Sequence, residues 1–113
     1  MEFKIKIKME LVITEEDIED IIDTAGYGIG YWAKRAIIGD DYYEVVDEDG
    51  VCHKLTYGDI CKGINQWYIT DGNIPYDIME FNGNNIGLDT GMIDSEMADM
   101  IIQYACFGEI IYG

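Results

Sequence analysis

The residue types best suited to chemistry are a single histidine and three cysteines. His53 follows Cys52 directly, and Cys61 and Cys106 lie further along the chain. Adjacent residues of a strand point to opposite faces, so Cys52 and His53 cannot work together as nucleophile and base, whereas His53 with Cys61 or Cys106 stays geometrically open. Structural zinc usually needs two pairs of N or S ligands. The pattern therefore favours an ordinary surface histidine and reduced, buried thiols, with no metal and no cofactor.

A glycine-rich segment at residues 26–30 invites comparison with a phosphate-binding loop. The third glycine of a Gly-x-Gly-x-x-Gly motif would fall at position 31, which is Tyr31. The segment also follows an expected helix, whereas that motif lies between a strand and a helix. We expect a structural role instead, in which Gly26 and Gly30, with Ala33, let another backbone come close.

The most informative feature is the acidic charge. The chain has 23 Asp and Glu against 7 Lys and Arg, a net charge of −16, and three of its basic residues lie among the first eight positions. This charge disfavours contact with nucleic acid or an anionic membrane. Sixteen charges correspond to about 27 Å of duplex DNA, so the protein could resemble DNA electrostatically. Carboxylates that simply maintain solubility are the other interpretation.

Two stretches hold the acidic residues that we predict to bind a partner. The first has helical spacing and faces away from Ile18, Ile21 and Ile22, and the second contains six carboxylates within ten residues. Whether the two stretches adjoin in space is open. They comprise Glu15, Glu16, Glu19, Asp20 and Asp23, and then Asp40, Asp41, Glu44, Asp47, Glu48 and Asp49.

A second group of residues would suit a nucleotide. Lys34 and Arg35 form a rare adjacent basic pair, and Tyr31 and Trp32 precede them with aromatic rings on which a base can stack. The chain has nine tyrosines and two tryptophans, which are common in cores and also at interfaces. This composition is compatible with a homodimer.

The patterns of apolar residues predict a single α+β domain over residues 1–113. Alternation at residues 3–13 indicates a strand, and residues 41–55 read as a hairpin, so we expect both in one small antiparallel sheet. Helices are predicted after Thr14, Thr56 and Asp94, and the first stays in helical phase to Ala36 with a kink or break near Gly26. A further hairpin would turn at residues 82–83, and residues 109–112 would be a short strand or tail.

Three segments of the chain resemble a family of small proteins carried by phages and integrative elements of clostridial-type bacteria. These segments are Ile13–Asp23, the Gly-Ile-Gly-Tyr-Trp run that ends at Trp32, and Asp94–Gly113. The resemblance covers about half of the chain and brings no catalytic residues with it. It implies an accessory gene of a mobile element, where small acidic proteins that obstruct host defence recur.

Together these features predict a non-enzymatic binding protein. It would occupy the basic, nucleic-acid-binding surface of a host defence protein, as DNA-mimicking anti-CRISPR proteins do. The alternative is a protein that sequesters a nucleotide defence signal, and an enzyme with an unrecognised site is a third option. No signal peptide and no apolar run of about 18 residues is present, so we expect a soluble protein in the cytoplasm of a bacterial host.

Overall fold

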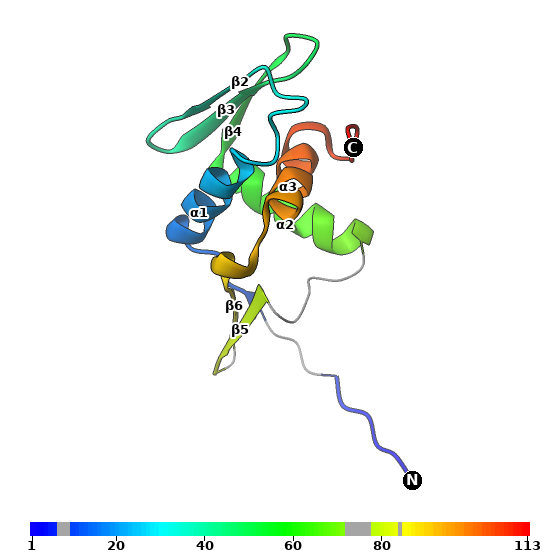
Figure 1. Ribbon diagram of the computed structural model, residues 1–113. Coiled ribbons are helices and arrows are strands. Elements are labelled where there is room, and N and C mark those ends of the chain that lie inside the picture. Colours follow the sequence, from blue (N-terminus) through cyan, green and yellow to red (C-terminus); the bar gives the residue numbers. More distant parts are fainter. Residues whose placement is uncertain (7–9, 72–77, 84) are drawn as a thin grey trace.

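The computed structural model describes residues 1–6, 10–71, 78–83 and 85–113. It has an α+β fold in which a helical layer lies between two small sheets (Figure 1). The helices are α1 (Glu15–Ala25), α2 (Tyr57–Asp71) and α3 (Ser95–Phe107), and a short 3-10 helix, η2, spans Thr90–Met92. The predicted fold class is therefore confirmed.

The upper sheet in Figure 1 is antiparallel and has the strand order β2-β3-β4. Its strands are β2 (Arg35–Ile38), β3 (Tyr42–Val46) and β4 (Cys52–Thr56). The predicted hairpin is β3–β4, and Gly50 adopts φ 81° in its turn, a conformation that glycine accommodates readily. Tyr43 and Val45 point from β3 into the core, so this sheet buries one face against the helices.

The lower sheet has the order β1-β6-β5. It consists of β1 (Glu10–Leu11), β5 (Met79–Asn82) and β6 (Asn85–Leu88), where β1 runs parallel to β6 and β5 runs antiparallel to it. The predicted turn at residues 82–83 is confirmed by Gly83, which has φ 60°.

The N-terminal strand is shorter than predicted and pairs with a different partner. Within the described residues it covers only Glu10–Leu11 and joins β6, and the third strand beside the hairpin is β2. Predicted strand residues 7–9 lie outside the described residues. Residues 1–6 form no strand, and the Phe3 and Ile5 side chains are more than four-fifths exposed. Alternation shows that a segment can form a strand, but it does not show which partner the strand finds.

The first helix ends earlier than its apolar pattern suggested. It stops at Ala25, residues 26–32 form turns, and Ala36 belongs to β2, so the predicted helical phase up to Ala36 is wrong. The three glycines at 26, 28 and 30 weaken a helix, and pairing with β3 gives the following residues their hydrogen bonds. The close approach predicted for Gly26 and Gly30 occurs instead at Gly28, where an added Cβ would clash with the Ser95 carbonyl oxygen.

All three helices begin at the predicted caps. Thr14 and Asp17 form a capping box, and the Thr56 and Asp59 side chains bond each other's backbone N–H groups in the same way. Asp94 caps α3, which ends at Gly108 with φ 73°. The glycine predicted to stop α2 lies outside the described residues. In the core, α3 packs against both α1 and α2, and its Ile101 and Ile102 are fully buried.

Candidate functional site

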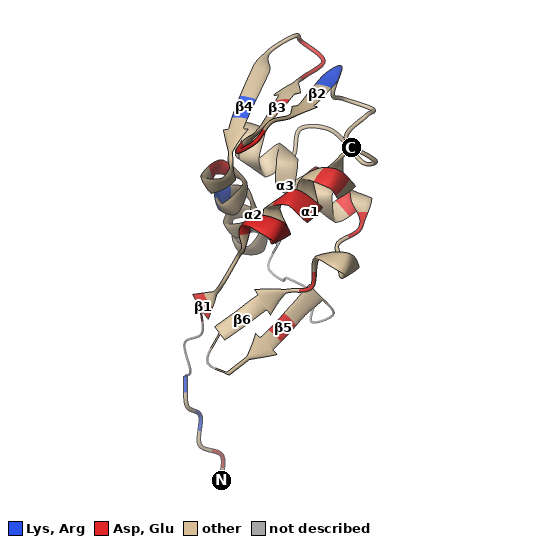
Figure 2. Ribbon diagram, turned by 90° about the vertical axis from the view of Figure 1, so that its left-hand side faces the viewer, with Lys and Arg blue, Asp and Glu red and all other residues tan. Residues whose placement is uncertain are grey.

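The outer face of α1 presents the first acidic stretch. Ile18, Ile21 and Ile22 are buried on the inner face, so the residues between them point outward. The exposed carboxylates are those of Glu15, Glu16, Glu19, Asp20 and Asp23, and Figure 2 shows acidic residues along this helix. One of them is held in place, because Thr90 Oγ1 donates a hydrogen bond of 2.7 Å to Asp20 Oδ2.

Part of the second acidic stretch adjoins this face. Asp40 and Asp41 form the exposed turn between β2 and β3. The Tyr57 hydroxyl lies 3.4 Å from the Asp40 carbonyl oxygen and 3.5 Å from Glu19 Oε1, and it can donate a hydrogen bond to either. Tyr57, the first residue of α2, thus bridges the turn and α1. We call these carboxylates the α1–turn surface, which comprises Glu15, Glu16, Glu19, Asp20, Asp23, Asp40 and Asp41.

The ionisation of Tyr57 reflects the charge around it. Its pKa is raised, first because the hydroxyl is partly desolvated and then because Glu19, Glu15 and Asp41 disfavour a second negative charge nearby. The hydroxyl therefore stays protonated and remains a donor among the carboxylates.

The rest of the second stretch lies elsewhere. Asp47 follows Asp41 by six residues along β3, which corresponds to about 20 Å of extended chain. Glu48 and Asp49 are exposed in the β3–β4 turn, at the far end of the hairpin. Glu44 is half-buried on β3 and accepts a hydrogen bond from Cys52 Sγ at 2.9 Å. These residues do not join the α1–turn surface.

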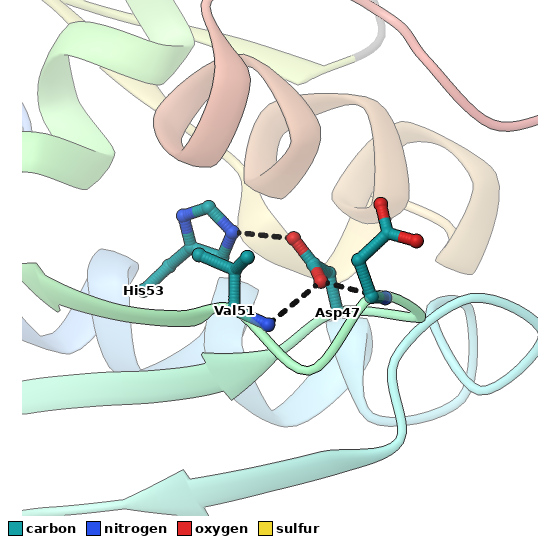
Figure 3. A network of polar contacts seen from close by, with 4 residues as sticks. Asp47, Val51 and His53 are labelled. Atoms are coloured by element: carbon teal, nitrogen blue, oxygen red, sulfur yellow. Dashed lines mark hydrogen bonds and ion pairs between the residues drawn. The ribbon is translucent and has the colours of Figure 1, made fainter.

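Asp47 holds the β3–β4 turn together (Figure 3). Its carboxylate is almost fully buried; Oδ1 accepts from the Asp49 and Val51 N–H groups at 2.9 and 3.0 Å, and Oδ2 lies 2.9 Å from His53 Nε2. The hydrogen bond with His53 lowers the pKa of Asp47, and the two backbone bonds act in the same direction against partial desolvation. A buried side chain cannot contact a partner, so Asp47 has a structural role where the sequence suggested a binding one.

Positive side chains do not neutralise the α1–turn surface. Within the described part of the chain, the only pair of opposite charges within 4 Å is His53 with Asp47. Lys54 lies on β4, with its Nζ 4.3 Å from the centre of the Tyr42 ring. In the described structure, the carboxylates of α1 and of the β2–β3 turn therefore have no lysine or arginine counterion within 4 Å.

The four residues of the predicted nucleotide site are divided between two environments. Trp32 is buried, with 1% of its surface exposed, so its ring cannot stack on a base. Tyr31 lies beside it, and both donate to the Asp99 carboxylate, at 2.6 Å from Tyr31 Oη and 2.8 Å from Trp32 Nε1. Lys34 and Arg35 are exposed at the start of β2. A phosphate near Tyr31 would thus meet a carboxylate.

Asp99 belongs to a buried polar network that the sequence did not reveal. Gln103, one turn further along α3, is fully buried and donates to Asp99 Oδ1 at 3.0 Å. Its Oε1 accepts from the Ile111 and Tyr112 N–H groups at 2.9 and 2.8 Å, and its Nε2 lies 3.1 Å from the Tyr112 carbonyl oxygen. The Gln103 amide therefore pairs with residues 111–112 as a neighbouring strand would.

Aromatic stacking completes the attachment of this C-terminal segment. The Tyr112 ring lies parallel to Trp32, with centroids 5.2 Å apart, and Phe107 packs edge-on against both. Desolvation, together with the hydrogen bond to Asp99 and the charge of that carboxylate, raises the pKa of Tyr31 to about 12. The sequence signal that could have pointed to this network is the helical spacing of two polar residues, Asp99 and Gln103, within α3.

The cysteines are all free thiols and none is activated. Burial raises the pKa of Cys106 to about 12, and burial also raises that of Cys61. The prediction of a buried thiol is wrong for Cys52, which is exposed because its side chain lies on the solvent side of β4. The hydrogen bond from Cys52 to Glu44 raises the pKa of this thiol as well. Within the described residues, no three His, Cys, Asp or Glu side chains gather as metal ligands would.

Comparisons with known proteins add no assignment. A scan of protein-family models, a search of curated proteins and a search of solved structures each found no match to this chain. The resemblance to phage and integrative-element proteins therefore stays a prediction. Among the described residues, no helix combines the length and apolar character needed to cross a membrane.

Proposed function

We propose that the protein is a non-enzymatic acidic binding protein of a phage or mobile element that acts in the cytoplasm of a bacterial host. Its α1–turn surface would occupy the basic, nucleic-acid-binding surface of a host defence protein. The observation that carries this proposal is the meeting of α1 and the β2–β3 turn around Tyr57, with no lysine or arginine within 4 Å of a carboxylate in the described chain.

The charge density of this surface supports a mimic of duplex DNA. The α1 helix has 11 residues and is about 16 Å long. The seven carboxylates of the α1–turn surface equal the charge on about 12 Å of duplex. Along α1 itself the five carboxylates of this surface give one charge per about 3 Å, within a factor of two of the linear charge density of the duplex. Neighbouring carboxylates on a helix face lie about 5–6 Å apart. Such a surface would attract a phosphate-binding groove and speed association at low salt.

The nucleotide alternative has less support. Its stacking residue Trp32 is buried and donates to Asp99, and the cavity beside Tyr31 is also lined by Glu96. A phosphate would lie close to two carboxylates there, which is unfavourable. Saturable thermal stabilisation of the protein by linear or cyclic nucleotides would contradict this reasoning and favour the alternative.

Capture from a host lysate followed by competition tests the proposed function. The immobilised protein should retain a nucleic-acid-binding protein, and added duplex DNA should displace it, because both ligands would occupy one basic surface. Retention that duplex DNA does not alter would contradict the mimic.

Variants of the surface make the test specific. Replacing Glu16, Glu19, Asp20 and Asp23 with Gln or Asn should leave folding intact and abolish capture. A matched control removes the same number of charges elsewhere, through Glu48→Gln, Asp49→Asn, Glu96→Gln and Glu109→Gln, all at exposed positions. The control should still capture the partner. Equal loss in both variants would show that net charge alone is responsible.

A further inference from the structure

The first six residues form an unpartnered basic strand sequence. Lys4 and Lys6 alternate with Phe3 and Ile5, and the segment extends away from the body in Figure 1. The Phe3 and Ile5 side chains are 86% and 84% exposed. An extended, alternating segment with one apolar face is a template for pairing with another chain. We call residues 1–6 the arm.

The register of the lower sheet explains why the arm pairs with no strand in the described part of its own chain. In the parallel pairing of β1 with β6, Glu10 lies opposite Asn85, the first residue of β6. Asn85 immediately follows the β5–β6 turn that contains Gly83. Residues that precede Glu10 by several positions therefore run past the end of the hairpin, where its strands offer no backbone to pair with.

Among the described residues, the lower sheet also has an open edge at β5. The sheet order places β5 outermost, and β6 pairs with its other side. The Asp89 N–H donates to the Ile78 carbonyl oxygen at 2.7 Å, so the backbone groups of Ile78 face β6. In an antiparallel ladder the direction of the backbone groups alternates along the strand, so the N–H and C=O groups of Met79 and Phe81 point away from β6. The Phe81 side chain is 58% exposed.

The arm and β5 have complementary side chains. On β5, Met79 and Phe81 lie on one face and exposed Glu80 on the other. On the arm, Phe3 and Ile5 would lie on one face and the lysines on the other. Pairing in either direction aligns apolar with apolar residues and Lys with Glu. The apolar face of this sheet lines a cavity of about 480 Å³ against α2, so it has room for further apolar contacts.

Charge distinguishes this edge from the others. The edge strand β2 begins with Arg35 directly after Lys34, and the edge strand β4 carries Lys54, so both would repel the arm. β1 is only two residues long. Within the described residues, β5 is therefore the edge that combines length, free backbone groups and an acidic side chain.

We propose that the arm of one copy adds as a strand to the β5 edge of a second copy. The arm cannot reach its own β5 along the sheet, because β6 lies between β1 and β5. A reciprocal exchange uses both arms and closes the assembly at two copies, as in most symmetric oligomers. This inference is independent of the proposed function, since the α1–turn surface takes no part in it.

Light scattering after size exclusion, combined with charge exchange, tests the proposal. The unmodified protein should have twice the 12.9 kDa mass of one chain. Glu80→Lys should raise the dissociation constant at least about tenfold, because two symmetry-related contacts change from attraction to repulsion. Lys4→Glu with Lys6→Glu should do the same, and combining all three substitutions should restore the dimer.

A matched control and a cross-link complete the test. Glu109→Lys makes the same change in charge at an exposed site far from the edge and should remain dimeric. In a mixture of isotopically light and heavy protein, carbodiimide should join Lys4 or Lys6 of one label to Glu80 of the other. A monomeric unmodified protein, a dimeric Glu80→Lys variant, an unrestored triple variant or cross-links only within one label would each overturn the proposal.

Discussion

The attachment of residues 111–112 to α3 should depend on one side chain, Gln103. Gln103→Ala removes the two hydrogen bonds that Gln103 Oε1 accepts from the backbone N–H groups of Ile111 and Tyr112. It also removes two hydrogen bonds donated by Gln103 Nε2, which has two hydrogens and lies within reach of three acceptors: Asp99 Oδ1, the Tyr112 carbonyl oxygen and Tyr31 Oη. The bond to the Asp99 carboxylate contributes about 2 kcal/mol and each neutral bond about 1 kcal/mol. Part of this is recovered, because Ile111 is half-exposed and the released segment can bind water. We therefore expect the free energy of unfolding to fall by about 3 kcal/mol.

Urea unfolding followed by far-UV circular dichroism measures this change. Gln66→Ala is the matched control, because Gln66 lies on the surface of α2 and bonds only Thr70 in the described structure; it should change the free energy by less than about 0.5 kcal/mol. Gln103→Glu keeps the shape but places a second carboxylate beside Asp99, so it should be more destabilising at pH 7 than at pH 4. A loss below about 1 kcal/mol for Gln103→Ala would refute the assigned role.

Three further outcomes follow from the structure. Because the pKa of Asp47 is lowered, its ionised form stabilises the fold at pH values above the ordinary pKa of 3.8, and this stabilisation is lost as the pH falls through the lowered pKa. Urea titrations at several pH values should therefore show that acid reduces the free energy of unfolding less in Asp47→Asn than in the unmodified protein. Iodoacetamide at pH 8 should label exposed Cys52 in the native protein but Cys106 only after unfolding, as mass spectrometry can show. Gly28→Ala should destabilise by at least about 2 kcal/mol in thermal unfolding, whereas Gly30→Ala, with open space around it, should be nearly neutral.

Features of the fold that depend on residues close together in the chain were predicted from the sequence. The caps at Thr14, Thr56 and Asp94 each form between residues three positions apart, so their signal is contained in a few letters. The acidic face of α1 was predictable for the same reason, because helical spacing alone places it. Both hairpins were found from their turn residues.

The features that were not predicted depend on contacts between residues far apart in the chain. Ala33 and Ala36 fit a helical phase, and only the pairing of β2 with β3 shows that Ala36 belongs to a strand. The contact of Tyr57 with Glu19 joins residues 38 positions apart, so the adjacency of α1 and the turn was not visible. The burial of Asp47 depends on how the hairpin packs, which a count of acidic residues does not contain.

The central position of α3 has a consequence for synthesis of the protein on the ribosome. This helix packs against both α1 and α2, and Trp32 and Tyr31 find their acceptor on it at Asp99, 67 and 68 positions later. Until α3 has left the exit tunnel, the apolar faces of the two earlier helices have no common surface on which to pack. The nascent chain should therefore remain open and accessible to proteases or chaperones until α3 has emerged, and then fold in one step.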